Sequence, residues 1–178
     1  KQHLELARDV AQRFNSIYGE TFILPEPVIA ETGARIMGLD DPTNKMSKSE
    51  VDAGHAINLL DSADGIRSRI IRATTDSLRE IRFDEARPGI YNLLVIYQLF
   101  TGLNETDIEA RFDGKGYADL KRELVEVVVE GLRPLQSRYR ELTADSEYVD
   151  SLLAEGASKV APIAAHTLSV VKEKMGLG

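Results

Sequence analysis

The feature that most constrains this fold is the helical spacing of apolar residues from residue 61 to residue 178. In its clearest stretch, about 118–142, the apolar stripe consists of Leu120, Leu124, Val127, Val128, Leu132, Leu135 and Tyr139. Steps of three and four residues place such side chains on one helical face, which buries against neighbouring helices. Pro134 within the stretch predicts a kink or a break. The pattern therefore predicts a long amphipathic helix inside a helical bundle.

Helix-start residues divide the rest of this region into shorter helices. Asp61 or Ser62 can cap one helix, and Pro88 can open the next. Asn104, followed by Asp107 three residues later, predicts the cap of a short third helix. Two final helices are expected at about 145–153 and 156–175.

The beginning of the chain has a different pattern. Apolar residues recur at helical spacing over 2–18, and Gly19 then ends the predicted helix. Residues 21–27 and 35–39 are short extended candidates, and 57–60 is a brief apolar run expected at the end of a strand. The sequence thus predicts a small α/β piece followed by a helical bundle, divided near residue 60.

Composition excludes several classes of site. With no cysteine, the chain forms no disulfide, zinc-thiolate site or catalytic thiol, which suits a cytoplasmic protein. The three histidines lie far apart without metal-ligand spacing, so no metal site is expected from the chain itself. No apolar run approaches the roughly 18 residues of a membrane span. The net charge of -7 argues against general nucleic-acid binding, although a local basic face can coexist with it.

A short lysine-rich loop carries the candidate chemistry, since residues 45–49 read Lys-Met-Ser-Lys-Ser. Asp41 and Pro42 start a turn just before it, which places the loop at the surface. Its two lysines supply mobile cations, and its two serines supply hydroxyl donors. Lysine acts on phosphate as a point charge on a flexible stem, and preorganised cations stabilise the charge that develops in nucleotidyl transfer. The loop therefore predicts a polyphosphate site; the alternative is a solvated connection.

Two other charged segments have structural interpretations. Six arginines occur between Arg67 and Arg87, where they could contact RNA phosphates. Acids alternate with them, so an ion-paired, solvated surface is favoured, with the candidate partners Asp64, Asp76, Glu80, Asp84 and Glu85. Residues 114–117, Gly-Lys-Gly-Tyr, are interpreted as a turn between helices with the tyrosine packed down.

The lysine loop and the residues before it resemble the tryptophanyl-tRNA synthetases, a class I family, in their bacterial form. The strongest matches are Gly33-Ala34-Arg35-Ile36-Met37, Asp41-Pro42-Thr43 and 45–49; weaker ones follow at 75–77, 88–90, 92–94 and 114–117. The resemblance covers essentially all 178 residues, as the C-terminal half of such an enzyme. It implies a mostly α chain: the end of a Rossmann-like α/β catalytic domain over 1–60, then a helical, anticodon-binding-type domain over 61–178.

The resemblance also implies a reaction and a site. Enzymes of this family join tryptophan to ATP, release pyrophosphate and transfer the tryptophanyl group to tRNA(Trp). The implied ATP-binding residues are Ile36, Lys45, Met46, Ser47, Lys48 and Ser49. Lys45 and Lys48 are the implied catalytic pair, and Ile36 and Met46 would lie near the adenine. Mg²⁺ would accompany the phosphates, and the intact enzyme is expected to be a cytoplasmic homodimer.

The tryptophan pocket of this family would lie before Lys1, so the chain is expected to be a fragment that does not activate tryptophan alone. A tyrosyl-tRNA synthetase is one alternative, although its bacterial members usually end in a basic module, whereas this chain ends in an acidic helical region. A non-catalytic helical module that binds a nucleotide or a protein is the other alternative.

Overall fold

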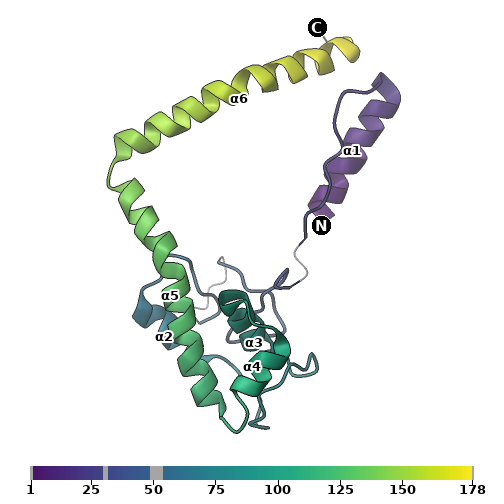
Figure 1. The fold of residues 1–178 in the computed structure, drawn as a ribbon. Helices are drawn as coiled ribbons and strands as arrows, with labels where there is room; N and C mark the ends of the chain where they lie inside the picture. The colour runs from purple at the N-terminus through teal and green to yellow at the C-terminus, as the bar shows by residue number, and fades with distance from the viewer. Residues whose placement is uncertain (1, 30–31, 49–53, 178) are drawn as a thin grey trace. The chain divides into compact units, whose positions relative to one another are not determined.

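The computed structural model describes residues 2–29, 32–48 and 54–177, and within these ranges it holds six helices and no strand. The chain forms two compact units (Figure 1). One consists of Lys1–Ile29 with Glu141–Gly178, and the other of Ala30–Arg140. The prediction of a mostly α chain is confirmed. The predicted domain boundary near residue 60 stays a prediction. The two compact units are defined by packing, and residues 30–60 pack with the helices that follow them.

The larger unit contains the hydrophobic core. Its helices are α2 (Ala63–Arg72), α3 (Pro88–Thr101), α4 (Glu105–Arg111) and most of α5 (Tyr117–Thr143). Helix α3 is buried on most of its faces, and the other three each turn one apolar face inward. The most deeply buried core side chains include Ile66, Ile70, Ile90, Leu94, Ile108, Leu120 and Leu124.

The predicted helix starts are confirmed. The Ser62 hydroxyl accepts a hydrogen bond from the Gly65 backbone N–H at 3.2 Å, and Pro88 is the first residue of α3. The Asn104 side chain accepts from the Asp107 N–H at 2.9 Å, which caps α4. Helix α5 runs through Pro134 without a break, because neighbouring turns on each side keep their own hydrogen bonds.

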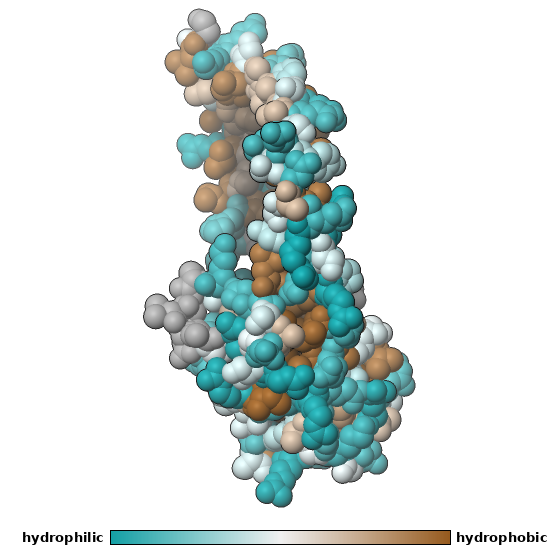
Figure 2. Space-filling view, turned by 90° about the vertical axis from the view of Figure 1, so that its left-hand side faces the viewer, coloured by the Kyte–Doolittle hydropathy of each residue, from teal (hydrophilic) through white to brown (hydrophobic). Residues whose placement is uncertain are grey.

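The smaller unit consists of α1 (Gln2–Tyr18), the segment after it, and α6 (Ser146–Lys174). Lys174 joins them, because its Nζ donates to the backbone carbonyls of Gly19 and Glu20 at 3.2 and 2.8 Å. Helix α6 buries none of its described residues completely, and apolar side chains are visible at the surface in the upper part of Figure 2. Exposed apolar residues on this helix include Leu152, Leu153, Val160, Ile163 and Leu168.

The expectation of two final helices is wrong, since α6 is continuous. Gly156 and Pro162 lie inside it. A glycine costs a helix only about 1 kcal/mol relative to alanine. The alanines that surround both positions are the strongest helix formers, and they carry the helix through.

The short extended segments do not form strands in the described residues. In 21–27 the Phe22 backbone N–H donates to the Asn15 side chain at 2.9 Å rather than to a neighbouring strand. In 35–39 there is one antiparallel bridge, between Met37 and Lys45. A strand needs a partner along its length; among the described residues 21–27 has none, and 35–39 pairs only around Met37. No described helix is long and apolar enough to cross a membrane.

Candidate functional site

The lysine loop is the outer part of a narrow backbone turn in the larger unit. The Met46 N–H donates to the Ile36 carbonyl at 3.0 Å, and the Gly38 N–H donates to the Asn44 carbonyl at 2.8 Å. Together with the bridge between Met37 and Lys45, these bonds pair the segment before the turn with the start of the loop. The backbone that enters the loop is therefore held in a defined register.

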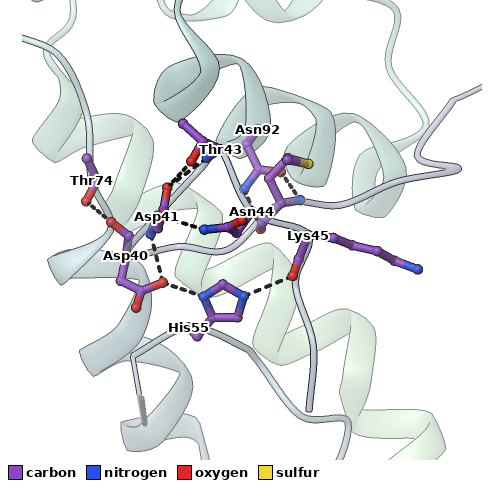
Figure 3. A network of polar contacts seen from close by, with 9 residues as sticks. Asp40, Asp41, Thr43, Asn44, Lys45, His55, Thr74 and Asn92 are labelled. Atoms are coloured by element: carbon purple, nitrogen blue, oxygen red, sulfur yellow. Dashed lines mark hydrogen bonds and ion pairs between the residues drawn. The ribbon is translucent and has the colours of Figure 1, made fainter. Parts of the chain in front are cut away.

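Asn92 fixes this turn to the core. It lies in the middle of apolar α3 and is 4% exposed. Its Oδ1 accepts from the Met37 N–H at 2.9 Å, and its Nδ2 donates to the Met37 carbonyl at 2.9 Å (Figure 3). The amide thus satisfies both backbone groups of one residue, which places the turn firmly against a buried helix.

Asp41 closes the tip of the turn. Its Oδ1 accepts from the Thr43 N–H at 2.9 Å and from the Thr43 hydroxyl at 2.6 Å, and its Oδ2 accepts from the Asn44 amide at 2.6 Å. The hydrogen bond from the Thr43 hydroxyl is the main cause that lowers the pKa of Asp41. The carboxylate is therefore ionised at neutral pH and shapes the backbone locally.

His55 joins the two sides of the turn. Its ring is within 2.7 Å of the Asp40 carboxylate through Nδ1 and within 3.0 Å of the Lys45 carbonyl oxygen through Nε2. Figure 3 shows the ring between these two groups. The Thr74 hydroxyl donates to the Asp40 carbonyl at 2.6 Å, which adds a contact from the segment after α2. His55 is 3% exposed, whereas Asp40 and Thr74 are exposed, so the network leads from a buried ring to the surface.

The two predicted catalytic lysines contrast with this network. Lys45 and Lys48 are exposed, and neither side chain makes an ion pair or a hydrogen bond to another described residue. In Figure 3 the Lys45 side chain extends away from the His55 ring. Two cations on an anchored backbone, without acidic partners in the described chain, are suited to bind an anion.

The other predicted site residues lie close to the two lysines. Ile36 and Met46 are half-buried, and both line an apolar cavity of about 210 Å³ between the turn, α3 and α5. Ser47 is half-buried within the loop, whereas Ser49 lies outside the described residues. The structure therefore brings Ile36, Lys45, Met46 and Ser47 together around the anchored turn, with Lys48 next along the loop.

Three residues of this network were missed by sequence reasoning. Asn92 had a local signal, because it is an amide inside an apolar helix. Asp40 and His55 had none, since their contact joins positions 15 residues apart in irregular chain. No group of three or more His, Cys, Asp or Glu among the described residues could hold a metal ion.

The ion-paired interpretation of the arginine series is confirmed for four of its members. Arg87 pairs with Asp76 at 2.8 Å, and Arg82 pairs with Glu80 at 2.9 Å. Two more use partners outside the predicted set: Arg67 with Glu126 and Arg69 with Asp61. These ion pairs neutralise most of the positive charge between Arg67 and Arg87, which could otherwise have formed a basic surface.

Tyr117 packs down as predicted for the turn at 114–117. Its hydroxyl accepts a hydrogen bond from Arg87 at 2.6 Å and donates to Asp76. The hydrogen bonds from Arg87 are the main cause that lowers the pKa of Asp76 to about 2. Asp76, Arg87 and Tyr117 therefore form a polar connection between the segment after α2 and the start of α5.

Comparisons with known proteins agree on one family. Residues 1–133 match the family described as tRNA synthetases class I (W and Y). The tryptophan–tRNA ligase of Wolinella succinogenes is 55% identical over 177 residues, which are 99% of this chain and 54% of that protein. The ligase of Caldanaerobacter subterraneus is 53% identical over 178 residues, with the same two coverages. The chain thus spans about half the length of the curated relatives it matches.

Solved structures give the same result. The tryptophanyl-tRNA synthetase from Mycoplasma pneumoniae superposes with a TM-score of 0.90 at 35% identity, over 99% of this chain and 54% of that one. The enzyme from Campylobacter jejuni, complexed with ADP and tryptophan, gives a TM-score of 0.68 at 31% identity, over the same shares.

Proposed function

The chain belongs to the family of class I tRNA synthetases for tryptophan and tyrosine, and from this premise we propose that it is the C-terminal half of an enzyme that activates tryptophan with ATP and transfers it to tRNA(Trp). The named relatives are tryptophan–tRNA ligases, which favours tryptophan over tyrosine. The family match and these relatives together favour the synthetase over a non-catalytic module.

One observation supports this proposal most strongly: two exposed lysines without acidic partners in the described chain lie on a turn that is fixed to the core. In the proposed reaction the tryptophan carboxylate attacks the α-phosphorus of ATP, and pyrophosphate leaves. Negative charge grows on the departing phosphates. The ammonium groups of Lys45 and Lys48 would neutralise that charge, most strongly in the transition state.

The remaining site residues have supporting roles in this proposal. Ile36 and Met46 would contact the adenine from the apolar side of the turn, and Ser47 and Ser49 would complete the phosphate-binding loop. Mg²⁺ fits as an ion carried by the phosphates, because the described residues provide no ligand cluster of their own. Lysine cations and a phosphate-bound Mg²⁺ act on the same charge and are compatible.

The proposal extends to organisation and partners. Residues 1–60 would be the end of the Rossmann-like catalytic domain, and 61–178 the helical domain that helps bind the anticodon of tRNA(Trp). The intact enzyme would be a homodimer in the cytoplasm. The tryptophan pocket would lie in the half of the relatives that this chain does not cover.

Aminoacylation tests the proposed function directly. The protein extended upstream to its natural start is incubated with ATP, Mg²⁺, tRNA and labelled tryptophan or tyrosine. Label from tryptophan alone should appear on tRNA. Label on tRNA from tyrosine instead would show that the substrate is tyrosine. Label from neither amino acid would favour the alternative of a non-catalytic helical module.

A further inference from the structure

We infer that His55 is a positioning residue for the lysine loop, and that its doubly protonated ring fixes Lys45 by joining the Lys45 carbonyl to the Asp40 carboxylate. We call these three residues the His55 clamp. The inference rests on the proposed function, because a role in ATP activation gives the clamp its purpose.

Hydrogen-bond chemistry sets the protonation state of the ring. Nδ1 faces a carboxylate oxygen of Asp40 at 2.7 Å, and Nε2 faces the carbonyl oxygen of Lys45 at 3.0 Å. Both of these groups only accept hydrogen bonds. A neutral imidazole has one N–H and can satisfy one of them, whereas the imidazolium has two and satisfies both. Beside an ionised Asp40, only the cation therefore satisfies both contacts.

The charges around the ring favour the same form. Asp40 is paired with it directly, and Asp41 is the next residue on the same turn. The Lys45 ammonium extends away from the ring (Figure 3). Asn92 and Thr74, which reach the turn from α3 and from the segment after α2, are neutral. The described charge in direct contact with the ring is thus the Asp40 carboxylate, which favours the cationic form.

The backbone is shaped to admit the ring. At Gly38, a side-chain carbon would lie 2.2 Å from Cε1 and 2.5 Å from Nδ1 of His55, which is closer than atoms can approach. The His55 carbonyl also accepts from the Leu39 N–H at 3.0 Å. His55 therefore contacts both sides of the turn through ring and backbone, with glycine providing the space.

The clamp acts on the lysine through its backbone. It holds the Lys45 carbonyl in place while the ammonium, at the other end of the side chain, remains exposed. Fixing the backbone before ATP arrives removes part of the ordering cost that binding would otherwise bear. Loss of the second ring proton would release the Lys45 carbonyl and leave it without its hydrogen bond from the ring.

Kinetics of ATP–pyrophosphate exchange over a range of pH test the clamp in the extended enzyme. For the wild type, KM for ATP should rise about tenfold as the ring loses its second proton, while KM for tryptophan stays constant. His55→Gln should raise KM for ATP by a similar factor at low pH and abolish its pH dependence. Asp40→Asn keeps the shape of the Asp40 side chain and removes the charge that stabilises the protonated His55 ring. The rise in KM for ATP should therefore occur at a lower pH. His166→Gln, an exposed histidine on α6, is the matched control and should behave as the wild type.

A second readout separates the clamp from the proposed function. Nitrogen NMR of ¹⁵N-histidine in the same protein, with His55 assigned by its loss in His55→Gln, reports ring protonation whether or not the enzyme is active. Two protonated nitrogens in the His55 ring of the wild type at pH 7 support the clamp. In Asp40→Asn, one ring nitrogen should lose its proton at a lower pH than in the wild type. One protonated nitrogen in the wild type at pH 7, or a KM for ATP that is flat with pH, would overturn it.

Discussion

At the scale of single residues, the turn at 36–48 separates structural groups from exposed ones. The side chains of Asp41, His55 and Asn92 form hydrogen bonds with the backbone and with neighbouring side chains. The side chains of Lys45 and Lys48 make no hydrogen bond to another described residue. Rigid support beneath mobile cations is the arrangement that electrostatic stabilisation of a transition state requires.

Replacing Lys48 tests the assignment of the cations. In the extended enzyme, Lys48→Ala should slow tryptophanyl-adenylate formation by about a hundred- to a thousand-fold, since a donor aimed at developing charge is lost. Tryptophan binding should change little. The measurement is single-turnover adenylate formation beside a tryptophan titration, with Lys172→Ala on α6 as the matched control. Equal losses of rate and tryptophan affinity would show that the lysine does not act on the transition state.

Asp76 gives a prediction about stability and pH. Arg87 lowers the pKa of Asp76 from 3.8 to about 2, so its stabilising effect is present above about pH 4 and disappears as the pH falls toward about 2. Because Asp76 is exposed and solvent screens the pair, Asp76→Asn should lower the free energy of unfolding at pH 7 by about 1 kcal/mol and flatten the acid limb of the stability curve.

Urea unfolding of the wild type and the variant at pH 7 and in mild acid measures this effect. Asp150→Asn, an exposed carboxyl on α6, is the control and should leave the curve unchanged. A difference between wild type and Asp76→Asn that persists unchanged at about pH 2 would contradict the assignment.

At the scale of elements, helices were predictable because their signals are local. The 2–18 helix, the caps at Ser62 and Asn104 and the long helix near 118–142 depend on residues a few positions apart. The expectation of two helices at the C-terminus was wrong, and the extended segment 35–39 forms a single bridge rather than a strand, because strand pairing depends on residues outside the segment. The lysine loop could be found from its sequence. Its support could not, since Asn92 contacts Met37 across 55 positions.

Helix α5 provides a prediction at this scale. Leu124 is completely buried, whereas Leu135 on the same helix is 44% exposed. Leu124→Ala should lower the free energy of unfolding by roughly 2–5 kcal/mol through lost burial and a cavity. Leu135→Ala, the matched control, should cost less than about 1 kcal/mol. Denaturant unfolding of both variants measures the difference, and similar costs would contradict the packing of α5.

At the scale of the whole molecule, the chain carries the lysine loop, for which we propose a phosphate-binding role, and a helical core, and it spans about half the length of its relatives. The proposed reaction needs a tryptophan pocket next to that loop. Under the proposed function, stability and chemistry are divided: the core of 30–140 holds the loop in shape, and residues outside this chain would present the amino acid to it.

The 178-residue chain alone should accordingly form no adenylate. Incubation with ATP, Mg²⁺ and tryptophan should release no tryptophan-dependent AMP or pyrophosphate above the level without protein. Measurable tryptophan-dependent product from the purified chain would show that its own residues include the amino-acid site.

Amino-acid-dependent ATP–pyrophosphate exchange by the protein extended to its natural start tests the central claim most directly. Tryptophan and tyrosine are assayed separately. The account predicts exchange with tryptophan alone, and a loss of exchange when Lys45 or Lys48 is replaced by alanine. Exchange with tyrosine instead, or exchange that survives both lysine substitutions at the wild-type rate, would contradict it.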